Sequence, residues 1–179
     1  MSTAAHDPAC ELAHGARSSE PDGRILVAVF DSPVASYLLH FARDLGYATA
    51  LVDPALSAEE AARVDGVRDA DRVAAGLDAS WVGPATDVVV TDHDRPELGE
   101  VLRDALGLPA RWVGVMGSPR HTAPHVAALR ALGVADTEIA RIHRPIGLNI
   151  GSRTPAEIAL ATLAGLIADR NDRPAGFVF

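Results

Sequence analysis

Short apolar runs alternate with helical segments along most of this chain, and this alternation limits the folds it can adopt. The first unit is ILVAVFDSPVASYLLHFARDLGY, in which the apolar run 25–30 precedes apolar residues at helical spacing. Further runs follow at YATALVD, TDVVV and RWVGVMG. Strands separated by helices pair in parallel, because the crossover returns the chain to the same edge of the sheet. We therefore predict an α/β fold with a doubly wound parallel sheet in three layers.

The chain divides into a tail and one domain. Residues 1–23 mix small and polar residues without apolar periodicity, which predicts a flexible N-terminal tail. Residues 24–179 are predicted to form a single domain. The formal net charge of −8 disfavours nucleic acid and anionic membranes as partners, and we expect no membrane segment and no signal peptide.

The cysteine and lysine content excludes further classes of protein. Cys10 is the single cysteine of the chain, so no internal disulfide can form, and this favours a cytoplasmic location. All 16 basic residues are arginine. A Walker-type phosphate loop and Schiff-base chemistry each need a lysine amine and are therefore excluded.

The turn after the first predicted strand reads D-S-P where a dinucleotide fingerprint has glycines. Ser32 is a plausible N-cap, which is the commoner use of such a residue, and Pro33 suits the first helical position. Gly46 suits the position just past the end of this helix. Pro33 removes an amide donor, and Asp31 places a negative charge where a phosphate would lie. Asp53 stands where an acid can bind a ribose hydroxyl, or it starts an Asp-Pro turn. We expect any ligand to be held mainly elsewhere.

Three later segments carry candidate ligand-binding residues: TDHD, GSPRH and HRPIGLNIGSRTPAE. In TDHD, Thr91 precedes His93, which lies between two carboxylates that would raise its pKa, as an acid or base requires; a solvated turn is the alternative. In GSPRH, Gly117 allows close backbone approach, Ser118 offers a hydroxyl and Arg120 can bind a phosphate or carboxylate. The start of the following helix could add to this anion site. No metal site is predicted.

The segment HRPIGLNIGSRTPAE has a period of two, which indicates an extended stretch with glycines where something comes close. An edge strand leading to the last helix is the alternative. The candidate binding residues of this segment are His143, Pro145, Gly147, Asn149 and Gly151.

The last helix is predicted from a capping box. Thr154 and Glu157 have the spacing of the box, with Pro155 at the first helical position. The helix TPAEIALATLAGLIADR is apolar nearly all round, so it must be covered on more than one side. We expect one side to face the sheet and another to form a homodimer.

Three motifs, VGVMGSPR, ARIHRPIGLNIG and TPAEIA, resemble the C-terminal Rossmann-like domain of the xanthine dehydrogenase accessory protein (XdhC/CoxI) family. The order and spacing of the motifs match across residues 111–170. The family's N-terminal domain and its G-x-G turn have no counterpart here. Pro119 replaces the first arginine of its G-S-R-R pattern, and Asn149 replaces an acid.

The resemblance implies a non-catalytic protein for the maturation of molybdenum hydroxylases, which binds, protects or delivers molybdenum cofactor. It implies as partners a molybdenum hydroxylase subunit or a separate protein that supplies the missing N-terminal domain. Two alternatives stay open: an NAD(P)-dependent oxidoreductase using Asp53 and His93, which is less favoured, and a non-catalytic interaction protein. The predicted cofactor-binding residues are Ser32, Asp53, Thr91, His93, Gly117, Ser118, Arg120, His143, Pro145, Gly147, Asn149 and Gly151.

Overall fold

The predicted parallel sheet is confirmed in a computed structural model, which describes residues 23–57, 59–60, 70–118 and 123–176. Its strands are β1 (Ile25–Val29), β2 (Ala48–Val52), β3 (Arg72–Ala74), β4 (Thr86–Val90) and β5 (Trp112–Val115). They pair in parallel in the order β3-β2-β1-β4-β5. The chain thus builds outward from β1 to β3 and then returns to add β4 and β5, which makes the junction of β1 and β4 the switch point of the topology.

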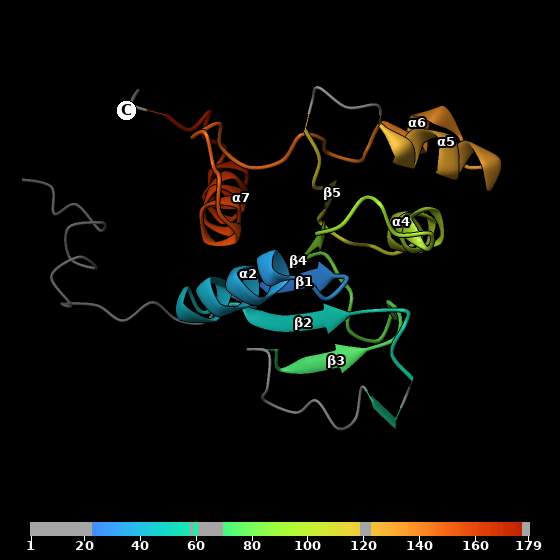
Figure 1. Cartoon of the computed structure of the whole chain (residues 1–179), viewed down its shortest axis with the longest axis horizontal. Coiled ribbons are helices and arrows are strands. Elements are labelled where there is room, and N and C mark those ends of the chain that lie inside the picture. The colour runs from blue at the N-terminus through green and yellow to red at the C-terminus, as the bar shows by residue number, and fades with distance from the viewer. Residues whose placement is uncertain (1–22, 58, 61–69, 119–122, 177–179) are drawn as a thin grey trace, which may run out of the picture.

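Helices cover both faces of the sheet, as Figure 1 shows. Helices α2 (Pro33–Asp44) and α7 (Pro155–Arg170) pack together on one face. Helices α4 (Leu98–Leu106), α5 (Pro124–Ala131) and α6 (Asp136–Ile139) form the layer on the other. The three predicted layers are therefore present.

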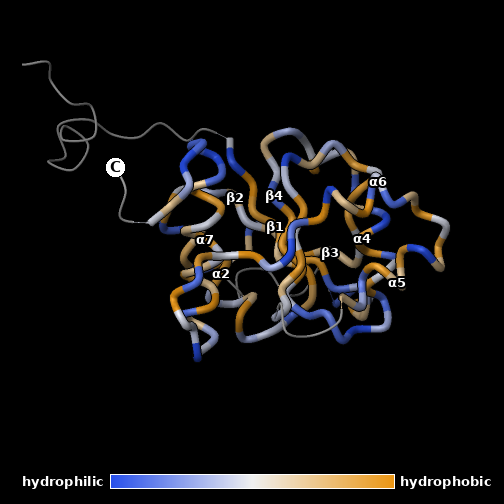
Figure 2. Tube along the Cα trace, turned by 90° about the horizontal axis from the view of Figure 1, so that it is seen from above, coloured by the Kyte–Doolittle hydropathy of each residue, from blue (hydrophilic) through white to orange (hydrophobic). Residues whose placement is uncertain are grey.

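The core consists of two apolar clusters, one on each face of the sheet. Leu26 and Ala28 of β1 point toward α2 and α7, whereas Val27 and Val29 point toward α4 and α5. All four side chains are fully buried. Strands covered on both faces are apolar at successive positions, which explains the uninterrupted apolar runs in the sequence. Figure 2 shows these strands as apolar stretches inside the domain.

The predicted ends of α2 and α7 are confirmed. The Ser32 hydroxyl accepts a hydrogen bond from the N–H of Ala35 and so caps α2. Gly46 follows this helix with φ of 81°, a conformation that glycine adopts readily. At α7, Thr154 and Glu157 form both hydrogen bonds of the capping box.

The segment between α6 and α7 crosses from one face of the sheet to the other. His143 pairs with Gly114 as an isolated parallel bridge beside β5. The N–H of Leu148 then donates to the carbonyl of Ala161 in α7 at 3.0 Å. A Cβ on Gly147 would lie 2.9 Å from the backbone nitrogen of Thr162. The predicted close approach at a glycine is found at Gly147, where the approaching group is the α7 backbone. The segment is not continuously extended, because it bends and Gly147 has φ of 82°.

A buried carboxylate ties α7 to the amino edge of the sheet. Asp87 of β4 is fully buried. Its Oδ1 accepts a hydrogen bond from Nε of Arg111 at 2.6 Å, and its Oδ2 accepts one from Nε of Arg170 at 2.8 Å. A buried charge needs such compensation, so Asp87 fixes the end of α7 against β4 and β5.

Some expectations fall outside the described residues. The tail 1–22 and Cys10 within it belong to this group. No helix among the described residues has the length and apolarity needed to cross a membrane.

Candidate functional site at the carboxyl edge of the sheet

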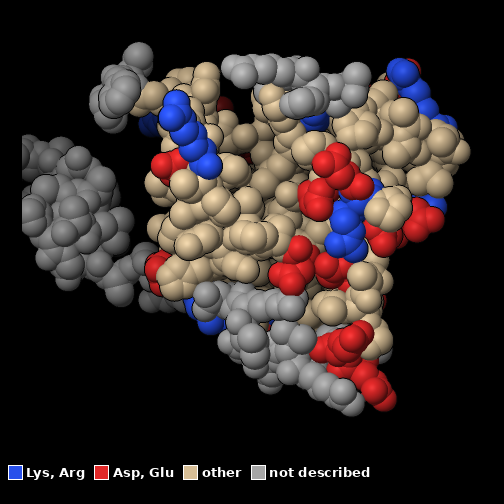
Figure 3. Space-filling view, in the orientation of Figure 1, with Lys and Arg blue, Asp and Glu red and all other residues tan. Residues whose placement is uncertain are grey.

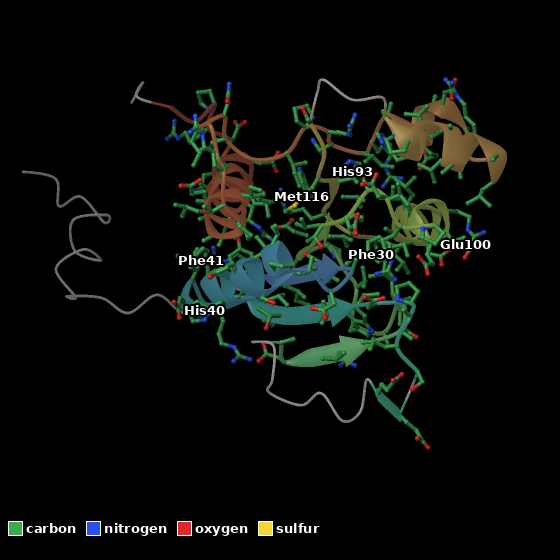
Figure 4. All side chains as sticks on the ribbon, viewed as in Figure 1. Phe30, His40, Phe41, His93, Glu100 and Met116 are labelled. Atoms are coloured by element: carbon green, nitrogen blue, oxygen red, sulfur yellow. The ribbon has the colours of Figure 1, made fainter. Side chains whose placement is uncertain are left out.

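The candidate site lies at the carboxyl ends of the strands, where two of the four residues that follow are polar. Phe30 follows β1, Asp53 follows β2, Thr91 follows β4 and Met116 follows β5. Figure 4 labels Phe30, His93 and Met116 at this edge. Ligands of doubly wound sheets bind here, beside the switch point. The sheet therefore brings to one edge the predicted residues that the structure describes at the ends of β1, β2, β4 and β5, namely Ser32, Asp53, Thr91, His93, Gly117 and Ser118.

Asp53 is turned inward, and both of its carboxylate oxygens accept hydrogen bonds from the chain. The side chain is 7% exposed. Its Oδ2 accepts a hydrogen bond from the N–H of Asp31 at 3.0 Å. Its Oδ1 accepts bonds from the N–H of Ala55 at 3.0 Å and from Nη2 of Arg95 at 3.3 Å. Three donors therefore occupy the oxygens that would have to bind a ribose diol.

The turn between β1 and α2 is closed by two hydroxyls. The Ser32 hydroxyl donates to Oγ1 of Thr91 at 3.0 Å. Thr91 in turn bonds the carbonyls of Val29 and Phe30, both at 2.9 Å. Phe30 has φ of 70°, an uncommon conformation for a residue with a side chain. These bonds hold the backbone in this conformation and link the ends of β1 and β4.

Arg95 occupies the space above the end of β1. Its guanidinium lies 4.8 Å from the centre of the Phe30 ring and also bonds Glu97. Burial lowers the pKa of Arg95, but the hydrogen bonds and charges of Glu97 and Asp53 outweigh this and raise it. Arg95 is therefore a fixed cation that ties Asp53 to the start of α4.

His93 lies beside one carboxylate. Its Nε2 is 3.7 Å from Oδ1 of Asp94, and its side chain is 30% exposed. The carboxylate of Asp92 instead accepts the N–H of Asp94. In the described part of the chain, no group of three or more His, Cys, Asp or Glu side chains is placed to hold a metal ion. His93 thus remains accessible for hydrogen bonding to a ligand at this edge.

At the end of β5, the loop and the crossing segment meet. A Cβ on Gly117 would lie 2.6 Å from Nε of Arg144, and Nη2 of Arg144 donates to the carbonyl of Ser118 at 3.0 Å. The predicted close approach at Gly117 is therefore made by an arginine of the chain itself. Arg120, predicted to bind an anion, lies outside the described residues.

The remaining predicted residues lie along the crossing segment. The ring of His143 stacks on Trp112 with centroids 4.8 Å apart. The peptide bond before Pro145 is cis. Asn149 and Gly151 are exposed, and nothing lies within 4 Å of a Cβ built on Gly151. Gly147 packs on α7, so this part of the motif holds the helix.

The predicted site residues did not include Arg95 and Arg144. Both follow a predicted site residue within one or two positions, His93 and His143 respectively. Their position in the chain was a usable signal, but the atoms that they contact come from elements far away in the sequence.

Carboxylates gather on the side of this edge formed by β2 and β3. A hollow of about 120 Å³ lies between the end of β2 and α4, and its lining includes Glu97, Glu100 and Asp104. Figure 3 shows acidic side chains clustered over this region. An anionic ligand is repelled there and favoured on the β4–β5 side, where Arg144 lies.

Together, the strand order and the polar strand ends define a Rossmann-type α/β domain with a candidate ligand site at the carboxyl edge of its sheet. The chain belongs to the XdhC family, because the model of the XdhC Rossmann domain matches residues 26–166.

Two similar proteins are longer than this chain. It is 33% identical over 109 residues to the uncharacterized protein YqeB of Escherichia coli (strain K12), which covers 61% of this chain and 20% of YqeB. Its fold is similar to a crystal structure described as a xanthine dehydrogenase from Bacillus halodurans. The TM-score is 0.63 at 22% identity, over 84% of this chain and 45% of that one. The chain thus spans less than half the length of either protein.

Proposed function

We propose that this chain is an accessory protein of the xanthine dehydrogenase system, which binds molybdenum cofactor and delivers it to a molybdenum hydroxylase. The observation that carries the proposal is the match of the XdhC Rossmann domain to residues 26–166. In this proposal the cofactor is cargo, and no residue of the chain catalyses a reaction.

The chemistry of the β4–β5 side suits such a cargo. Molybdenum cofactor is an anionic pterin with a phosphate, so it requires hydrogen-bonding groups together with positive charge. His93 offers the first at the end of β4, and Arg144 offers the second beside Gly117. Met116 adds an apolar surface that is 8% exposed. We propose that these residues hold the cargo.

The geometry of Asp53 weighs against the alternative of an NAD(P)-dependent oxidoreductase. In that class an acid at the end of the second strand binds the ribose, and helix amides bind the pyrophosphate. Here the acid accepts three hydrogen bonds from the chain itself. The first helical position of α2 is Pro33, which has no N–H to donate.

The test is capture of the cofactor by the purified chain. Molybdenum cofactor released anaerobically from a denatured molybdoenzyme is mixed with the chain and passed over a sizing column. Pterin fluorescence after oxidation then reports the cofactor in the protein fraction. NAD and NADP are tested in parallel by thermal shift.

We expect the cofactor to elute with the native chain and with His40→Ala. This variant is the matched control, because His40 lies on the exposed face of α2. His93→Ala should retain about tenfold less, because a hydrogen bond to a charged group is lost. No cofactor in the protein fraction, or a thermal shift with NADP alone, would overturn the proposal.

Partners are a further part of the proposal. We propose that a molybdenum hydroxylase subunit receives the cofactor and that a separate protein supplies the N-terminal domain of the family. Self-association through α7 also remains a proposal. Leu160 of this helix is 55% exposed, while α2 and the crossing segment cover its other sides. Sedimentation of the purified chain tests this point.

A further inference from the structure

A second hollow lies beyond the edge of the sheet, between α5, α6 and the start of the crossing segment. Its volume is about 410 Å³, which is within the range of small-molecule sites. Its lining comprises Ala123, His125, Val126, Arg130, Asp136, Ile139, Ala140, Ile142 and Arg144. It is thus separate from the switch point, and only Arg144 belongs to both regions.

His125 is the unexplained group in this lining. The residue is 5% exposed, and its Nδ1 is buried without a hydrogen-bond partner among the described residues. A buried polar atom without a partner destabilises the folded state, so folded proteins seldom contain one. A bound acceptor in the hollow would remove that cost.

The charge around His125 favours an anion. Burial lowers the pKa of His125, and the nearby guanidinium of Arg144 lowers it further. An anion placed between the imidazole and the guanidinium would oppose this lowering of the pKa, since it would stabilise the protonated ring. The only carboxylate in the lining, Asp136, is already held by two hydrogen bonds from Arg130.

The start of α5 adds partial positive charge to the same place. Its N-cap is Ala123, which makes no side-chain cap, whereas Ser32 and Thr154 cap α2 and α7. Pro124 at the first helical position has no N–H, and the N–H of Val126 donates to the carbonyl of Ala123. This helix start therefore contributes mainly the positive end of its dipole, which suits a phosphate.

The other wall of the hollow is apolar. Val126, Ile139 and Ile142 line it together with Ala140. Ile139 and Ile142 also belong to the core cluster beneath α5, so this wall is fixed in place. A ligand that fills the hollow therefore combines an anionic group with a flat apolar body.

We propose that this hollow is a binding site for a phosphate monoester on an aromatic or heterocyclic body. The phosphate lies against His125, Arg144 and the start of α5. The body packs on the apolar wall. This inference does not depend on the proposed function, because it rests on the hollow and its lining alone.

Calorimetric titration of the purified chain tests it with three probes: inorganic phosphate, phenyl phosphate and phenol. Phenyl phosphate should bind about tenfold more tightly than inorganic phosphate, because it also buries apolar surface. Phenol should not bind measurably. His125→Asn should weaken phenyl phosphate at least about tenfold, and His40→Asn should leave it unchanged.

A measurement on the native chain guards against misfolding of the variant. The ¹⁵N resonances of the His125 ring should shift during titration with phenyl phosphate, and those of His40 should not. Absence of saturable binding, equal binding by His125→Asn, or shifts confined to His93 would overturn the inference. AMP and molybdenum cofactor, as competitors, show which source of phosphate is preferred. Phenyl phosphate binding without cofactor capture would leave the site standing and reject the proposed function.

Discussion

The N–H of Asp31 donates to the carboxylate of Asp53 at 3.0 Å, across the ends of β1 and β2. In dinucleotide-binding domains, an acid at the position of Asp53 hydrogen-bonds the ribose, and the turn after the first strand binds the pyrophosphate. Here the acid is instead hydrogen-bonded to that turn. The carboxylate of Asp53 thus occupies the ends of β1 and β2, next to the switch point between β1 and β4. This agrees with the proposal that a ligand binds nearer β4, β5 and the crossing segment.

Asp53→Asn should lower the free energy of unfolding by about 1–3 kcal/mol, because the new NH₂ faces a backbone donor and the pair with Arg95 is lost. Urea unfolding measures this. Asp44→Asn, an exposed change on α2, is the control and should stay within about 0.5 kcal/mol. Equal stability of both variants would show that Asp53 is not a structural acid.

Gly114→Ala should destabilise the domain by about 1–3 kcal/mol through overpacking. A Cβ at Gly114 would lie 2.1 Å from the ring of Trp112 and 2.8 Å from Ile146. Gly83→Ala, with nothing within 4 Å of its Cβ, is the matched control. Thermal melting compares the two, and an unchanged Gly114→Ala midpoint would mean that Trp112 moves freely.

Asp87→Asn should cost about 2–4 kcal/mol, since it leaves Arg111 and Arg170 without their shared charge at a buried position. Asp104→Asn breaks only an exposed pair with Arg103 and should cost well under about 1 kcal/mol. Chemical denaturation distinguishes these results. A similar small loss in both variants would contradict the role given to Asp87.

Stability should fall as the pH drops below the ordinary histidine range. The pKa of His125 is lowered in the folded state by burial and by Arg144. The unfolded chain therefore binds a proton first, near pH 6.5, and stability declines from about that pH down through the lower folded pKa. Protonation of carboxylates with a lowered pKa, such as Asp71 and Asp136, also reduces stability, but only at lower pH, below about 4.

His125→Phe should remove this dependence between about pH 7.5 and 5.5, within the window set by the histidine reference value. Unfolding at several pH values measures it. Phenyl phosphate should bind more tightly at the lower pH in the native chain, because it stabilises the protonated ring. A variant with the same slope as the native chain would show that another group causes the decline.

Local sequence signals predicted the elements well. The apolar runs, Ser32, Gly46 and the Thr154–Glu157 box each depend on neighbours a few residues away, and each is confirmed. The parallel sheet in three layers was also predicted correctly, because strands separated by helices pair through crossovers. Such features are set by propensity and periodicity alone.

The roles of individual polar residues were harder to predict. Whether Asp53 binds a ribose or a turn depends on Asp31 and Arg95, which lie 22 and 42 positions away. Gly147 was predicted to mark a close approach, but the sequence could not show that the approaching group is α7. No sequence pattern marked His125 as a candidate binding residue, because its unpartnered atom results from the packing of α5, α6 and Arg144.

Helix α7 also determines the order in which the domain can assemble. Arg170 reaches Asp87 across 83 positions of sequence, and all five strands precede α7 in the chain. As the polypeptide leaves the ribosome, the part of the sheet face beside α2 that α7 covers therefore stays open until residues 155–170 have been synthesised. Long-range closure of this kind slows folding and leaves apolar surface available to chaperones in the interval.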